Sequence, residues 1–281
     1  MRFLLVLILI PLITTAKEFV LVSVYPFYDV LKELSGDRFR VEVLIPPKAD
    51  YHLYELSSKE IKKISQARLV FVSGIPLGGW ERKVEEISGN RAFKLAEGIE
   101  LKSSGEHGGV KTDPHIWLSP KRMMLVAENA YKAFVKLEPD KEDIYRENLR
   151  KVLDKLKELD RDYRENLKSC KHRVIPIPHP ALGYLAQDYG LSQLSIGSGD
   201  VHGDISPIEL SRFISEVKEK GINFMFEIYG ARSKYADVFT KEYNLRIYRL
   251  NVKIIPSEHG KDYFSIMRYN LKVLREALEC M

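Results

Sequence analysis

The sequence lacks the features that mark membrane-embedded or nucleic-acid-binding chains. After residue 16, no apolar stretch approaches the ~20 residues that a helix needs to cross a bilayer. Charged residues make up 30% of the chain, but they are interspersed, without a long block of one sign. A nucleic-acid-binding face concentrates its positive charge. We therefore expect no transmembrane segment in the mature chain and no nucleic-acid partner.

Cysteine is also scarce, with Cys170 and Cys280 as the only two in the chain. Their spacing matches no zinc motif. In an exported protein, which meets an oxidising environment, such a pair is expected to form a disulfide. That bond would tie the C-terminal helix to the start of the second half of the chain. Two unrelated thiols are the alternative.

The N-terminus has the three parts of a secretory signal peptide. Arg2 is basic, Phe3–Ile13 is a short apolar core, and Thr14–Ala16 is a small-residue cleavage site. No cysteine lies near the cleavage point. We therefore expect export, cleavage near Ala16, a mature chain that begins near Lys17, and no lipidation.

Strand and helix patterns alternate along the chain, which predicts mainly parallel sheets flanked by helices. In the first half, strands are expected at 19–24, 39–44 and 69–72, and helices at 28–34, 57–65 and 80–87. In the second half, strands are expected at 172–177, 193–196, 223–227 and 246–250, and helices at 181–189, 207–219, 232–242 and 262–279.

The longest helical pattern separates these two halves. Between Glu138 and Cys170, apolar residues recur every three to five positions with charged residues between them. A helix of roughly 27 residues is ~40 Å long, more than a small domain is wide. We therefore expect an N-terminal α/β lobe at 17–138, a linking helix at 139–169 capped by Asp140, and a C-terminal α/β lobe at 170–281.

Three histidines each lie where a strand-like run ends and a helix is about to begin. His52 precedes the helix at 57–65, His115 precedes a helix that opens at Ser119-Pro120, and His179 follows the strand at 172–177. In open α/β sheets, ligands bind beyond the carboxyl ends of the strands. We expect the three imidazoles to converge there and to supply most of a tetrahedral Zn²⁺ site.

The segments around these histidines carry distinctive motifs. Leu44–Leu56 (LIPPKADYHLYEL) is similar to VPPGADPHxYEP, Asp113–Pro120 matches DPHxWLSP fully, and His179–Leu191 is similar to HxAFGYFxxxYGL. Ile205–Pro207 and Phe226-Glu227 stand where EPSP and FAEP are usual. In this order, the motifs resemble those of the periplasmic metal-binding proteins of zinc and manganese ABC importers (solute-binding proteins of cluster A-I). The resemblance covers essentially the whole mature chain.

The resemblance implies two α/β lobes joined by a rigid helix, with one metal ion between them. It makes His52, His115 and His179 the ligands. Histidine in the third position is the zinc-type pattern, whereas manganese-type relatives tend to have Glu there; imidazole suits Zn²⁺ and carboxylate suits Mn²⁺. The implied protein is a periplasmic monomer and not an enzyme. It would capture Zn²⁺ and deliver it to the integral-membrane permease of an ABC importer.

The chain departs from the family pattern at the fourth ligand. The usual Asp of a late LDPL segment corresponds to Asn251, so the possible fourth ligand is an amide, which binds Zn²⁺ more weakly than a carboxylate. We expect Glu227 to compensate, either as a direct ligand or by accepting the free ring N–H of a ligating histidine. This reasoning predicts that Glu227→Gln weakens zinc binding and that Asn251→Asp strengthens it.

Four other histidines lack such support. The family's loop before the second ligand is often long and rich in His and acidic residues, but here the loop at 102–111 is short and holds only Glu106 and His107. We interpret His107 as a solvated loop residue. His172, His202 and His259 are expected to be structural or surface residues.

Two other functions use the same three histidines. A Mn²⁺- or Fe²⁺-binding protein of the same transporter type would keep the fold and change the metal. An exported zinc-dependent hydrolase would place water on the zinc and use Glu227 as its base. The lack of an HExxH helix and the origin of the ligands in two lobes argue against the hydrolase.

Overall fold

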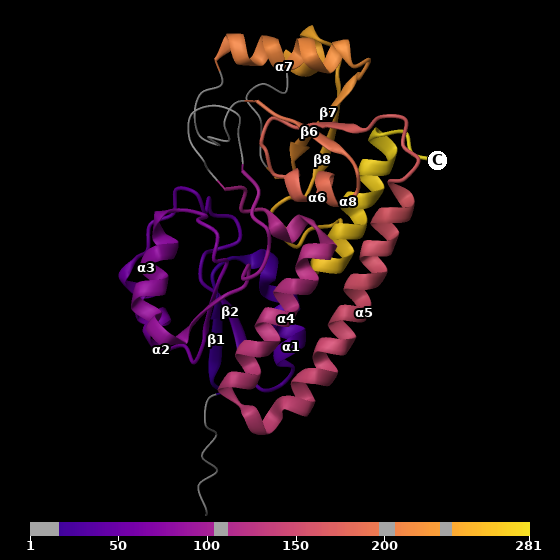
Figure 1. The fold of residues 1–281 in the computed structure, drawn as a ribbon. Coiled ribbons are helices and arrows are strands. Elements are labelled where there is room, and N and C mark those ends of the chain that lie inside the picture. Colours follow the sequence, from indigo (N-terminus) through magenta and orange to yellow (C-terminus); the bar gives the residue numbers. More distant parts are fainter. Residues whose placement is uncertain (1–16, 104–111, 197–205, 231–237) are drawn as a thin grey trace, which may run out of the picture.

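The computed structural model describes residues 17–103, 112–196, 206–230 and 238–281, which form two α/β lobes (Figure 1). The expected signal peptide at 1–16 lies outside the described residues, and so do His107 and His202. Among the helices of the described ranges, none combines the length and apolarity that a membrane crossing needs.

A four-stranded parallel sheet, in the order β2-β1-β3-β4, forms the centre of the first lobe. Its strands are β1 (Phe19–Val22), β2 (Arg40–Val43), β3 (Val70–Val72) and β4 (Ala92–Lys94). All of β3 is buried, because a parallel sheet is covered by helices on both faces. Strand β4, which has only three residues, was not predicted from the sequence.

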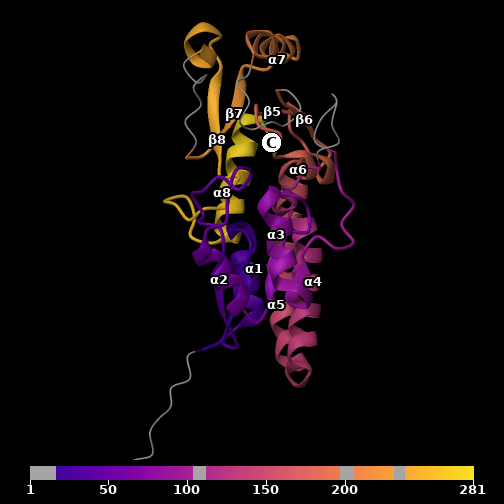
Figure 2. The same cartoon turned by 90° about the vertical axis from the view of Figure 1, so that its left-hand side faces the viewer.

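The helices of the first lobe are α1 (Tyr28–Ser35), α2 (Ser58–Gln66), α3 (Gly79–Ser88) and α4 (Pro120–Leu137). Helices α2 and α3 contact each other, and α1 and α4 contact each other on the side of the lobe that faces α5 (Figures 1 and 2). At the start of α2, the backbone N–H of Ser57 donates to Glu60 Oε2 at 2.8 Å, in a capping box.

The long central helix is α5 (Glu142–Asn166), which extends from the first lobe to the second (Figure 1). It contacts α1 and α4 of the first lobe and α8 (Tyr263–Ala277) of the second. The predicted cap was wrong: Lys141, not Asp140, precedes the helix, because Pro139–Lys141 forms a separate 3-10 turn. The division of the chain at residues 138 and 170 stays a prediction.

Two parallel strand pairs form the second lobe. β5 (Val174–Pro176) pairs with β6 (Ser192–Leu194), and β7 (Phe224–Ile228) pairs with β8 (Arg246–Leu250). Besides α8, its helices are α6 (Gly183–Asp188) and α7 (Pro207–Glu219). Of the helix expected at 232–242, only Val238–Glu242 is described, and it is a π-helical turn.

The last residues of the chain are joined to the segment before β5. Cys170 and Cys280 form a disulfide, and the backbone N–H of His172 donates to Leu278 O at 3.1 Å. The end of α8 is thus attached both covalently and by hydrogen bonds to the beginning of the second lobe.

Candidate metal centre

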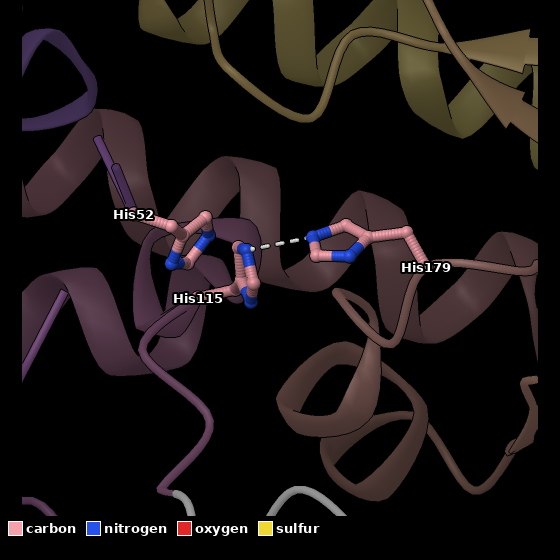
Figure 3. A group of neighbouring side chains, drawn as sticks. All are labelled: His52, His115 and His179. Atoms are coloured by element: carbon pink, nitrogen blue, oxygen red, sulfur yellow. Dashed lines mark hydrogen bonds between the residues drawn. The ribbon is translucent and has the colours of Figure 1, made fainter. Parts of the chain in front are cut away.

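His52, His115 and His179 lie together where the two lobes meet (Figure 3). One ring nitrogen from each residue lies within 4.8 Å of the other two. The Nε2 atoms of His115 and His179 are 3.3 Å apart. In the described part of the chain, this is the one group of three His, Cys, Asp or Glu side chains with such geometry.

The strand-end prediction applies to two of the three residues. His52 follows β2, and His179 follows β5. The prediction was wrong for His115, because no strand precedes it in the described residues 112–114. Thr112 makes only an isolated bridge to Ser103. A 3-10 turn, Ile116–Leu118, then separates His115 from α4.

A short Asp-x-His element shapes the backbone at both histidines of the first lobe. The N–H of His52 donates to Asp50 Oδ1 at 2.9 Å, and the N–H of His115 donates to Asp113 Oδ1 at 2.9 Å. Each aspartate thus accepts from the backbone two residues further on, as in an Asx turn. The loop that carries His52 and the loop that carries His115 are thus built locally in the same way.

The loop between β3 and α3 orients the ring of His52. His52 Nδ1 lies 2.9 Å from Leu77 O, so this nitrogen carries the proton and Nε2 keeps its lone pair. Buried Glu81 accepts from the backbone N–H groups of Ser73 (2.7 Å) and Leu77 (3.3 Å). Burial raises the pKa of Glu81 to about 7. Glu81 was not predicted from the sequence, where its only signal is an acidic residue on the buried face of an amphipathic helix.

Asp113 orients the ring of His115. Its Oδ1 lies 2.8 Å from His115 Nδ1, and both side chains are almost fully buried. A carboxylate in this place fixes the tautomer and leaves Nε2 to face a metal. The other carboxylate oxygen lies against Gly183 of α6, where an added Cβ would come within 2.7 Å of it. Gly183 therefore allows the second lobe to approach this pair.

His179 stands between Pro178 and Pro180, which restrict its backbone. The N–H of Ala181 donates to His179 O at 2.8 Å, and Ile196 N–H donates to Pro178 O at 3.2 Å. These bonds hold the short loop after β5 and direct the half-buried imidazole towards the first lobe (Figure 3).

The spacing of His115 and His179 suits a tetrahedral zinc ion. Nitrogens bound to zinc at ~2.0–2.1 Å in a tetrahedron are ~3.3–3.4 Å apart. The 3.3 Å between His115 Nε2 and His179 Nε2 has this value. In His52 and His115 the partner at Nδ1 is an acceptor, so Nδ1 carries the N–H and Nε2 is the nitrogen left to face a metal. The three rings offer imidazole nitrogens, which zinc accepts well.

Glu227 and Asn251 make other contacts. Glu227 is not part of the three-histidine group; its Oε2 lies 3.6 Å from Arg249 Nη2. Burial raises the pKa of Glu227, and Arg249 partly opposes this shift. Asn251 Nδ2 donates to Ile255 O at 2.7 Å, and its Oδ1 accepts from Ile255 N–H at 3.0 Å. The ligand roles expected for both residues stay predictions.

The two remaining described histidines have structural surroundings. The ring of His172 lies edge-on to Phe224, and its Nε2 is 3.8 Å from Glu279. The ring of His259 stacks on Tyr269 with a centroid distance of 4.2 Å. Neither belongs to the three-histidine group.

Comparisons with known proteins give close relatives. The chain is 31% identical over 286 residues to the zinc-binding protein AdcA of Streptococcus pyogenes serotype M3, an alignment that covers 92% of this chain and 56% of that protein. It is 29% identical over 280 residues to the high-affinity zinc uptake system protein ZnuA of Bacillus subtilis, covering 93% and 88%. This chain therefore spans about half the length of the AdcA relatives.

A solved structure has the same fold. The crystal structure of the Zn(II)-bound ZnuA-like domain of Streptococcus pneumoniae AdcA superposes with a TM-score of 0.81 at 28% identity, over 94% of this chain and 100% of that one. The family model of ZnuA, described as zinc-uptake complex component A, periplasmic, matches residues 20–277. The chain therefore belongs to the ZnuA family of periplasmic zinc-uptake components.

Proposed function

We propose that this protein captures Zn²⁺ outside the cytoplasmic membrane and delivers it to the permease of an ABC importer. The observation that carries the proposal is the separation of 3.3 Å between His115 Nε2 and His179 Nε2, which suits a tetrahedral zinc ion. Family membership supports it, because the relatives named above are zinc-binding and zinc-uptake proteins.

The proposed ligands are His52, His115 and His179. Their donors are imidazole nitrogens, which suit Zn²⁺ better than Mn²⁺. Binding requires neutral rings. The bonds from Nδ1 to Leu77 O and to Asp113 orient the rings of His52 and His115 and leave Nε2 of each as the donor to the metal. Glu227 would compensate the charge of the ion from the end of β7, as a ligand or through a histidine N–H.

The position of the site between the lobes supports transport rather than catalysis. Two ligands come from first-lobe loops and one from the second lobe, so a relative movement of the lobes would open or close the site (Figure 3). Capture and release of an ion need such a change. In this proposal the protein is not an enzyme, and its partner is the permease.

Metal titration tests the proposal. The mature protein, freed of metal, would be titrated with Zn²⁺, Mn²⁺ and Fe²⁺ in competition with a chromogenic chelator, with elemental analysis of the loaded protein. We expect one Zn²⁺ per chain, bound more tightly than the other two ions. A preference for Mn²⁺ or Fe²⁺ would favour the alternative transporter, and no binding of any of the three would overturn the proposal.

A further inference from the structure

Asn251 closes a turn at the end of β8. Both ends of its amide bind the backbone of Ile255, through Nδ2–H to Ile255 O (2.7 Å) and from Ile255 N–H to Oδ1 (3.0 Å). Asn270 of α8 in turn binds the backbone of Asn251. Asn251 N–H donates to Asn270 Oδ1 (2.8 Å), and Asn270 Nδ2 donates to Asn251 O (3.1 Å). Asn251 and Asn270 are both buried. One N–H and the oxygen of the Asn251 amide thus hold residues 251–255.

The turn is conformationally strained. Ile254 has a φ of 53°, in the left-handed region that a β-branched residue rarely adopts. Its side chain is completely buried. Such a conformation persists only where the surroundings impose it. The N–H of Ile254 donates to Asn251 O at 3.4 Å, and the two side-chain bonds of Asn251 hold the next residue, Ile255.

The same turn contacts both first-lobe loops that carry proposed ligands, the loop of His52 and the loop of His115. Trp117, two residues after His115, donates from Nε1 to Val252 O at 2.8 Å. The rings of Trp117 and His115 are 5.2 Å apart. On the other side, Lys253 Nζ lies 3.4 Å from Ala49 O and 5.4 Å from the ring centre of Tyr51, the neighbour of His52. A single short turn of the second lobe therefore contacts residues next to His115 and residues next to His52.

We propose that Asn251 is a positioning residue and not a metal ligand: it closes the 251–255 turn, which holds the loops of His52 and His115 in place against the second lobe. This inference rests on the proposed zinc-binding function. It explains why the chain has an amide where the resemblance suggests a carboxylate. Asp in this place has no N–H for Ile255 O and would set a negative charge against that carbonyl.

The inference reverses the expected sign of one substitution. If residue 251 acted as a ligand, Asn251→Asp would restore a charge beside the ion and strengthen binding. If residue 251 closes the turn, Asn251→Asp breaks one of its two bonds, loosens Trp117 and weakens binding. The two roles therefore differ in the direction of the change in zinc affinity.

The experiment measures Zn²⁺ affinity by chelator competition for four proteins. They are the parent, Asn251→Asp, Asn270→Ala and Asn129→Asp. Asn129 is a matched control, because its Nδ2 also donates to carbonyls, those of Leu95 (3.0 Å) and Glu97 (2.8 Å), but on α4 of the first lobe. We expect Asn251→Asp, which loses one buried hydrogen bond, and Asn270→Ala, which loses two, each to bind zinc at least about tenfold more weakly. Asn129→Asp should bind like the parent.

A second readout does not depend on zinc. The chain has only two tryptophans, so the indole N–H resonances of Trp80 and Trp117 are easily assigned. In the metal-free protein, we expect faster hydrogen exchange of the Trp117 indole in Asn251→Asp and Asn270→Ala than in the parent and in Asn129→Asp. Should Asn251→Asp fail to fold, Asn270→Ala tests the same turn with residue 251 intact.

Each outcome has a definite meaning. Tighter or equal zinc binding by Asn251→Asp, or parent-like affinity and exchange in Asn270→Ala, would overturn the inference. If the parent itself binds no zinc, the proposed function fails, and the exchange of Trp117 still decides whether Asn251 holds the turn against the first lobe.

Discussion

His115 Nε2 and His179 Nε2 lie 3.3 Å apart, although 64 positions separate the two residues in the sequence and they belong to different lobes. The separation has the value expected for two ligands of one tetrahedral zinc ion. It also depends on the contact between the lobes, since neither lobe alone brings these two nitrogens together. Zinc affinity should therefore respond to changes in the contact as well as to changes in the ligands.

Single replacement of each proposed ligand should weaken zinc binding. We expect His52→Ala, His115→Ala and His179→Ala each to lower the affinity by orders of magnitude, because each removes one of three protein donors. His259→Ala is a control, since its ring stacks on Tyr269 outside the group. Parent-like affinity in any one of the three would remove that residue from the site.

The close approach of Gly183 to Asp113 gives a second prediction. A Cβ at Gly183 would lie 2.7 Å from Asp113 Oδ2, so Gly183→Ala should displace the carboxylate that orients His115 and weaken zinc binding. Gly79→Ala is the matched control: Gly79 also begins a helix, and its Cβ would meet nothing within 4 Å. Equal zinc affinity in the two variants would show that this approach is unimportant for the site.

Burial of Glu81 predicts a dependence of stability on pH. The pKa of this carboxyl is raised from 4.5 to about 7 in the folded protein. Between these values the folded state binds a proton that the unfolded chain has lost, so the free energy of unfolding should fall as the pH rises. The loss is on the order of 3 kcal/mol. Urea unfolding at several pH values should show a flatter dependence in Glu81→Gln than in the parent.

The control for Glu81 is an exposed glutamate of the same helix. Glu86 pairs with Arg82 on the surface of α3, and Glu86→Gln should keep the pH dependence of the parent. The idea would be wrong if Glu81→Gln and the parent lost the same stability over this range.

Charge compensation by Glu227 gives a fourth prediction. Its carboxyl is buried at the end of β7, and Oε1 has no hydrogen-bond partner among the described residues. A positive ion in the site would favour the charged form of this group, so Glu227→Gln should weaken zinc binding. Glu258→Gln, on the surface beside Tyr229, is the control. Unchanged affinity in Glu227→Gln would exclude both roles proposed for this carboxylate.

The disulfide between Cys170 and Cys280 predicts a loss of stability on reduction. It closes a loop with a sequence separation of 110, for which the chain-entropy model gives ~4–5 kcal/mol, although measured values are often lower. We expect the exported protein to resist thiol labelling until it is reduced, and to unfold at a lower temperature afterwards. Two thiols that label freely in the native exported protein would contradict the bond.

Features that depend on neighbouring residues could be predicted from the sequence. The alternation of strands and helices, the capping box at Ser57 and the long helix between the lobes follow from local periodicity and local hydrogen bonds. The three histidines stood out because each lies in a short motif at the start of a helical segment. The prediction failed at β4, an edge strand that includes Lys94 and is not fully buried, because no apolar run marks its three residues.

Contacts between distant segments were decided only by the tertiary structure. Nothing in the sequence near His52 indicates that Leu77 O accepts from its ring, because any residue offers a backbone carbonyl. The approach of Gly183 to Asp113 and the reach of the 251–255 turn to Trp117 depend likewise on how the lobes pack. The sequence by itself determined which side chains can bind a metal. Packing between the lobes decided how far apart these side chains lie and which groups orient them, because those distances are set by contacts between residues far apart in the chain.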